Sequence, residues 1–106
     1  MEQMHTRGSE MTDIHKMVLR LFGLWGLDDS QQSVLLGIVN VDKSAKASLL
    51  QIHAMLRLLY PNHPLRYEWI TRYNARLDGS RPIDIMLTGA SGIEQIRKSL
   101  KVQLLR

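Results

Sequence analysis

Several side chains of this sequence belong to types that carry out chemistry. Asp84 and Glu94 could act as an acid–base pair, but nothing in their spacing makes them partners, and charge at a helix start explains both better. The glycine-rich turn 89–92 precedes a helix and could bind phosphate through backbone amides, yet it lacks the Lys-Ser or Lys-Thr pair of a P-loop. His53 has no second ligand at metal-binding spacing. We therefore predict no enzyme activity, no metal site and no cofactor.

Composition narrows the class of protein further. The chain has 106 residues and no cysteine, which excludes disulfides, zinc–thiolate sites and thiol catalysis. Its hydrophobic content of 44% is typical of a globular protein. It contains neither an uninterrupted apolar run of about 18 residues nor a signal-like N-terminus. We expect a cytoplasmic protein without a membrane span.

The positive charge of the chain lies in its C-terminal part. Residues 1–60 contain six Lys or Arg and six Asp or Glu, whereas residues 61–106 contain eight basic residues and four acidic ones. The whole net charge of +4 therefore comes from the second segment. A basic surface favours an anionic partner, either nucleic acid or an acidic protein cleft, and the alternative is a solvated helix face.

Apolar spacing predicts helices in the N-terminal half. Positions between Ile14 and Trp25 recur on one helical face, so a helix is expected from about residue 12. Asp28 precedes Gln31 by three residues, which is a capping-box pattern, and the short helix that follows is expected to end at Gly37. The segment 48–60 is apolar on nearly every side, which predicts a central helix buried on nearly every side.

Proline and glycine divide the C-terminal half into short elements. Pro64 suits the first turn of a helix that carries Trp69, and Pro82 begins another short helix. Between them, Asp78 and Gly79 form a tight turn. The last helix is expected over about 91–105, with Ile93, Ile96, Leu100 and Leu104 on its apolar face and Arg97, Lys98 and Lys101 opposite. The pattern predicts an all-α protein of about six helices.

A helix, a short loop and a second helix open the chain like a helix-turn-helix unit. DNA reading of this type needs three or four side chains from one helix in the major groove. The segment between residues 38 and 49 looks too short for a separate recognition helix. Its only basic side chains, Lys43 and Lys46, are the candidates for DNA contact, and we predict a degenerate version of the motif.

The C-terminal pattern resembles the toxin-binding domain of Xre/MbcA/ParS-type antitoxins. That family shows a Trp, then Asn-x-x-Leu-x-Gly-x-x-Pro, a Leu pair, a Gly and a closing helix. The matching residues are Trp69-Ile70, the run from Asn74 to Leu87, Gly92-Ile93, Ile96 and Leu100, and the resemblance covers about residues 50–104. Residues 21–38 look like the Xre-like helix-turn-helix half of the same proteins.

The resemblance implies a domain organisation and a function. Residues 1–10 would be a flexible tail, 11–47 an Xre-like region and 48–106 the toxin-binding domain. Such antitoxins are usually homodimers that neutralise a RES-domain toxin, an NAD-consuming enzyme, by covering its active site, and many repress their own operon. Carried onto this chain, the toxin-facing side chains would be Arg76, Arg81, Arg97, Lys101 and Arg106.

Two alternatives remain beside the antitoxin hypothesis. One is a DNA-binding transcriptional regulator, and the other is an orphan helical protein-interaction module. For the antitoxin, basic side chains suit a cleft built for dinucleotide phosphates and their acidic neighbours, because a guanidinium pairs bidentately with carboxylates.

Overall fold

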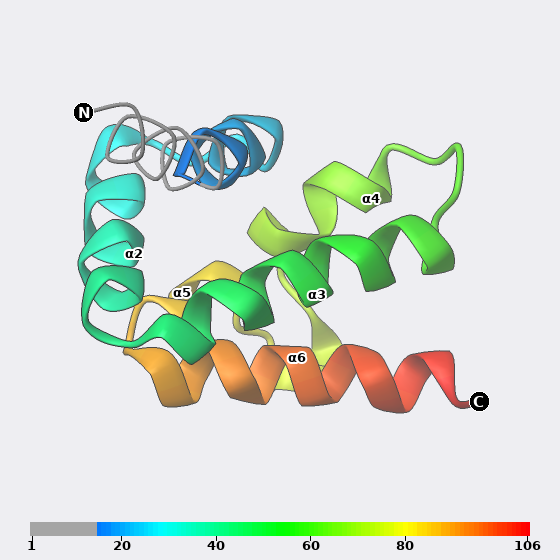
Figure 1. Cartoon of the computed structure of the whole chain (residues 1–106). Helices are drawn as coiled ribbons and strands as arrows, with labels where there is room; N and C mark the ends of the chain where they lie inside the picture. The colour runs from blue at the N-terminus through cyan, green and yellow to red at the C-terminus, as the bar shows by residue number, and fades with distance from the viewer. Residues whose placement is uncertain (1–14) are drawn as a thin grey trace, which may run out of the picture.

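The computed structural model describes residues 15–106, and this part of the chain is helical without a β-strand (Figure 1). Residues 15–24 are helical, and the later α-helices are α2 (Asp29–Val41), α3 (Lys43–Leu59), α4 (Leu65–Glu68), α5 (Pro82–Met86) and α6 (Ala90–Leu104). Two 3₁₀ turns, η1 (Trp69–Thr71) and η2 (Ala75–Leu77), lie between α4 and α5. The predicted all-α class is confirmed, while the predicted tail 1–10 lies outside the described residues.

The helices α3 and α6 form the frame of the molecule. They lie side by side and run in the same direction, so that both end near the C-terminus of the chain (Figure 1). Their facing residues are fully buried, with α5 packed against α6 and the residue 15–24 helix adding aromatic side chains. The largest buried side chains are Phe22, Trp25, Leu35, Leu49, Ile52, Leu56, Ile70, Ile83, Met86, Ile93, Ile96 and Leu100.

The helix α2 begins where the sequence predicted and ends later. Asp28 Oδ1 accepts a hydrogen bond from Gln31 N at 2.7 Å, and Gln31 Oε1 accepts one from Asp28 N at 3.0 Å, which confirms the capping box. The predicted end at Gly37 is wrong, because α2 continues to Val41. Glycine inside a helix costs about 1 kcal/mol relative to alanine. Burial of Val39, one turn beyond Leu35 on the same face, offsets that cost.

Only one residue separates α2 from α3. Asp42 ends α2 through a backbone hydrogen bond to Ile38 and caps α3 by accepting a hydrogen bond from Ser44 N at 2.9 Å. The central helix therefore starts five residues before the predicted position. No separate helix lies between α2 and α3, as the short segment indicated.

The prediction that the central helix is buried on nearly every side is wrong. One face of α3 is buried against the core, but Leu58 is 70% exposed and Gln51 and Ala54 also face solvent. The neighbouring elements cover one side of α3, and its remaining apolar side chains lie on the surface. Within residues 15–106, no helix combines the length and apolarity needed to cross a bilayer.

The corner between α5 and α6 is tightly packed. Pro82 occupies the first helical position of α5, as predicted. A Cβ on Gly92 would lie 2.0 Å from the carbonyl oxygen of Ile85, so only glycine fits here. The observed α6 agrees with the predicted last helix to within one residue at each end. This corner fixes the direction in which α6 carries its basic side chains.

Candidate protein-binding site

A hydrogen-bonded turn presents Arg76 to solvent. Asn74 Oδ1 accepts from Arg76 N at 2.9 Å, and Asn74 and Ser80 form an isolated antiparallel bridge. Asp78 and Gly79 both adopt positive φ values, 56° and 80°, which closes the turn. The backbone that carries Arg76 is therefore held in one conformation, while its side chain is exposed.

Tyr73 is a surface residue that follows the segment carrying Trp69. It lies beyond η1, is 77% exposed, and has the Arg81 guanidinium 5.7 Å from its ring centroid. Exposed aromatic and arginine side chains are enriched in protein interfaces. Its position immediately before the Asn-led turn was the only sequence signal for this role.

Arg81 is not free to meet a partner, since it is paired within the chain. Its Nε and Nη2 atoms each lie 2.9 Å from an oxygen of Asp84, in a bidentate arrangement at the start of α5. The hydrogen bonds from Arg81 hold the pKa of the Asp84 carboxyl below its ordinary value, and Asp84 raises the pKa of Arg81. The ion pair joins the residue before α5 to the first turn of α5, so it holds the start of this helix in place.

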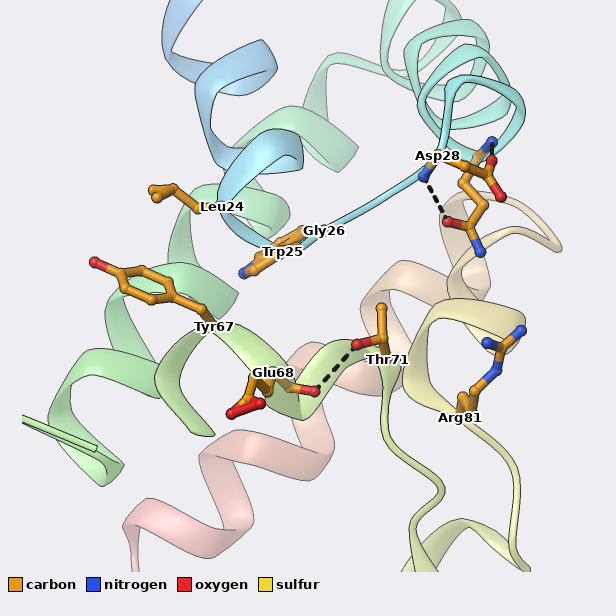
Figure 2. Close-up of a pocket in the computed structure, with 9 residues that line it drawn as sticks. Leu24, Trp25, Gly26, Asp28, Tyr67, Glu68, Thr71 and Arg81 are labelled. Atoms are coloured by element: carbon orange, nitrogen blue, oxygen red, sulfur yellow. Dashed lines mark hydrogen bonds between the residues drawn. The ribbon is translucent and has the colours of Figure 1, made fainter. Parts of the chain in front are cut away.

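Arg81 also lines a pocket of about 380 Å³ between the N-terminal helices and the α4–η1 segment (Figure 2). Figure 2 shows Asp28 and Arg81 at one end of this pocket and Leu24 and Tyr67 at the other. Trp25 is buried in its wall, and the indole nitrogen has no hydrogen-bond partner within the described chain. The pocket lies where the two halves of the molecule meet, away from the end of α6.

Arg97 is likewise engaged inside the molecule. It hydrogen-bonds to Glu94 through Nε at 3.0 Å and contacts Gln51 of α3, while Ser48 donates to the same Glu94 carboxylate at 3.2 Å. These contacts hold the pKa of Glu94 below its ordinary value. Arg97 was expected on the solvent side of α6, but it is half-buried at the α3–α6 seam.

Lys101 and Arg106 extend from the end of the molecule. Both are exposed, and none of the ion pairs formed within residues 15–106 involves either one. Apolar side chains accompany them, with Val102 54% and Leu105 78% exposed. We call this surface, formed by Lys98, Lys101, Val102, Leu105 and Arg106, the basic end of α6. Its three cations, Lys98, Lys101 and Arg106, lie outside the ion pairs formed within residues 15–106.

The candidate DNA contacts lie apart from the basic end of α6. Lys43 and Lys46 occupy the first turns of α3, next to the Asp42 cap. The segment 38–49 contains no separate recognition helix, because α2 runs to Val41 and α3 begins at Lys43, and α2 itself contains no Lys or Arg. Phosphate binding depends on such cations. The helix α2 therefore offers no cation for DNA, while Lys16, Arg20 and Lys43 are exposed on the helices before and after it.

His53 is half-buried on α3. The His53 and Tyr67 rings are stacked, with their centroids 6.5 Å apart. The Nδ1 atom of His53 has no hydrogen-bond partner among the described residues. Burial, together with Arg57 nearby, lowers its pKa. Across residues 15–106, His, Asp and Glu side chains do not gather in a group of three that could hold a metal.

Comparisons of the chain with models of protein families, with curated proteins and with solved structures gave no match.

Proposed function

We propose that this protein is an antitoxin that binds and neutralises an NAD-consuming RES-type toxin by covering its active site. The observation that carries the proposal is the pattern from Trp69 to Leu100, which resembles the toxin-binding domain of Xre/MbcA/ParS-type antitoxins.

The roles of the pattern residues in the fold support this proposal. Asn74 caps η2, Gly79 closes the turn at positive φ, Pro82 starts α5, and Gly92 admits the carbonyl of Ile85. Each of these four residues therefore has a backbone requirement that few other residue types meet. A pattern with such requirements specifies a particular turn and helix corner, and chance composition accounts for it poorly.

The ion pairs divide the five candidate arginines and lysines into two groups. Arg81 and Arg97 are held by Asp84 and Glu94, and both would have to break existing pairs to bind elsewhere. Arg76, Lys101 and Arg106 are exposed and outside these pairs. We propose that these three contact the toxin, while Arg81 and Arg97 position the turn and α6.

The test is co-expression with the product of the neighbouring open reading frame, followed by purification of the complex and an assay of NAD consumption. We expect a stable complex with suppressed activity. The double variant Lys101→Glu/Arg106→Glu should weaken binding about tenfold or more, because like charges then face the acidic cleft. The matched control Lys43→Glu/Lys46→Glu makes the same change in charge on α3 and should bind normally.

A neighbouring NAD-consuming enzyme that stays fully active and unbound in the presence of this protein would contradict the proposal. Equal loss of binding in both double variants would contradict the assignment of the toxin-facing surface to the basic end of α6.

A further inference from the structure

The pocket in Figure 2 has no part in the proposed neutralisation, because none of the three proposed toxin contacts lines it. Its volume of about 380 Å³ lies within the range of about 300–1,000 Å³ that is typical of small-molecule sites. Polar side chains from separate segments of the chain surround it, among them Asp28, Glu68, Thr71 and Arg81. The fold therefore contains a polar pocket, large enough for a small molecule, that the proposed function does not explain.

Asp28 and Arg81 lie at the same end of the pocket (Figure 2) and keep polar atoms available there. Arg81 binds Asp84 through Nε and Nη2, and its Nη1 atom has no partner within residues 15–106. Asp28 Oδ1 accepts from Gln31 N at 2.7 Å, and Oδ2 accepts no hydrogen bond from the same part of the chain. The hydrogen bonds and the charge of Asp84 raise the pKa of Arg81, and the nearby charge of Asp28 raises it further. One donor and one acceptor of opposite charge therefore stay available near each other.

The wall of the pocket contains a hydrogen-bond donor that has no partner in the described chain. Trp25 is 1% exposed, and its indole nitrogen is unpaired among residues 15–106. Figure 2 shows this nitrogen on the side of the ring toward Leu24 and Tyr67, away from the Asp28–Arg81 end. Buried donors are nearly always hydrogen-bonded in native proteins, so an unpaired donor in a pocket wall indicates a ligand that carries an acceptor.

The opposite charges of Asp28 and Arg81 select a ligand that carries both signs itself. A simple anion would be attracted by Arg81 and repelled by Asp28, and a simple cation would meet the reverse. A zwitterion suits both side chains, because its carboxylate can accept from the guanidinium while its ammonium donates to the aspartate, and hydrogen bonds between charged groups are the stronger ones. We propose that this pocket binds a free α-amino acid, with its ammonium group at Asp28 and its carboxylate at Arg81.

The side chain of the amino acid would extend toward the other end of the pocket. Leu24 is 43% exposed there, so contact with a ligand would remove apolar surface from water, which is favourable. A side-chain amide, as in glutamine, would also give the Trp25 indole N–H an acceptor. The indole nitrogen is covered by its neighbours, so this hydrogen bond requires a small shift of the pocket wall. A bound amino acid would thus join the N-terminal half of the molecule to α5.

The experiment measures binding of the common free amino acids to the full chain by titration calorimetry and by the NMR signal of the Trp25 indole N–H. Concentrations up to about 10 mM are used, because ligands with few non-hydrogen atoms bind weakly. We expect binding that shifts the Trp25 signal, with glutamine bound more tightly than leucine, which lacks an acceptor. The N-acetyl derivative lacks the ammonium group and the decarboxylated amine lacks the carboxylate, so each should bind about tenfold more weakly.

Variants of the lining residues test each contact separately. Asp28→Asn keeps a residue type that caps helices equally well but removes the charge, so it should weaken binding about tenfold in a folded protein. Asp29→Asn makes the same change at the neighbouring exposed aspartate, which does not line the pocket, and should bind normally. Arg81→Gln should weaken binding as Asp28→Asn does, and Trp25→Phe should remove the preference for glutamine over leucine. Circular dichroism confirms that each variant is folded.

Failure of every amino acid to bind at these concentrations overturns the proposal. So does equal binding of the N-acetyl or decarboxylated derivatives, because the site would then not recognise a zwitterion, and so does binding that Asp28→Asn leaves unchanged. None of these measurements involves a toxin, so their failure leaves the proposed neutralisation to its own test.

Discussion

The helices α2 and α6 each contain a glycine in their interior, and the two glycines have opposite surroundings. A Cβ on Gly37 of α2 would meet nothing within 4 Å, whereas a Cβ on Gly92 of α6 would lie 2.0 Å from the Ile85 carbonyl oxygen. The first glycine only weakens its helix, since glycine loses the most backbone entropy on folding. The second allows α5 and α6 to approach each other.

The two helices also differ in how many of their residues are buried. Two residues of α2, Leu35 and Val39, are buried, while four of α6 are, including Ile93 and Ile96 with no exposed area. Two hydrogen bonds also tie α6 to α3: Ser48 donates to Glu94, and Arg97 donates to Gln51. The helix α6 is therefore attached to the rest of the molecule by more buried contacts than α2 is.

The largest expected effect is at the α5–α6 corner. Gly92→Ala should destabilise the protein by about 3 kcal/mol, because the added methyl group overlaps a backbone carbonyl that cannot move without shifting α5. Urea denaturation followed by circular dichroism measures the change. A loss below about 0.5 kcal/mol would show that the corner is not closely packed.

The next effect concerns the start of α2. Asp28→Ala removes one half of the capping box and should cost about 1 kcal/mol. The α6 helix has no side-chain cap at Gly89, so its start depends on packing alone. Urea denaturation measures the cost, and an unchanged midpoint would mean that packing also determines where α2 begins.

A smaller effect of opposite sign is expected inside α2. Gly37→Ala should stabilise the protein by about 0.5–1 kcal/mol, because alanine fits the helical backbone and finds open space around it. Gly37→Ala is the control for Gly92→Ala, because it makes the same substitution in a helix where the added methyl group has room. If both substitutions destabilise the protein, the contrast between the two helices fails.

The last prediction concerns the attachment of α6 to α3 at low pH. Hydrogen bonds from Arg97 and Ser48 lower the pKa of Glu94 from its ordinary value of 4.5, so the unfolded chain binds this proton more tightly than the folded one. Their contribution to stability is complete above about pH 4.5 and is lost as the pH falls through the lowered pKa. Glu94→Gln should flatten the fall in stability below pH 4.5, as measured by urea denaturation at a series of pH values.

Local signals in the sequence predicted the local features correctly. The capping box at Asp28 and the start of α5 at Pro82 each depend on residues a few positions apart. The end of α2 was predicted wrongly because the role of a glycine depends on its distant neighbours. Nothing near Gly37 in the sequence reveals that Val39 is buried, and nothing near Gly92 reveals how close Ile85 lies.

The candidate site was only partly predictable. All five basic residues were candidates from the resemblance, and two of them have an acidic residue three positions away, in Arg81–Asp84 and Glu94–Arg97. That spacing is a usable signal for ion pairs on a helix. The exposure of Tyr73 could not be predicted, because it depends on where the helical segment ends, and η1 ends at Thr71, before Tyr73.

Asp28, Asp29 and Asp42 lie at the two ends of α2, and the basic end of α6 lies at the opposite end of the molecule (Figure 1). This separation of negative and positive charge gives the molecule an electric dipole, which can orient it in the field of a charged partner. An approaching anionic surface attracts one end and repels the other before any contact forms, so encounters should begin with the C-terminal end in front. Such steering raises the rate of association more than its final strength, and it fades as ionic strength increases. The order of charges along the chain thereby selects which end of the protein reaches a partner first.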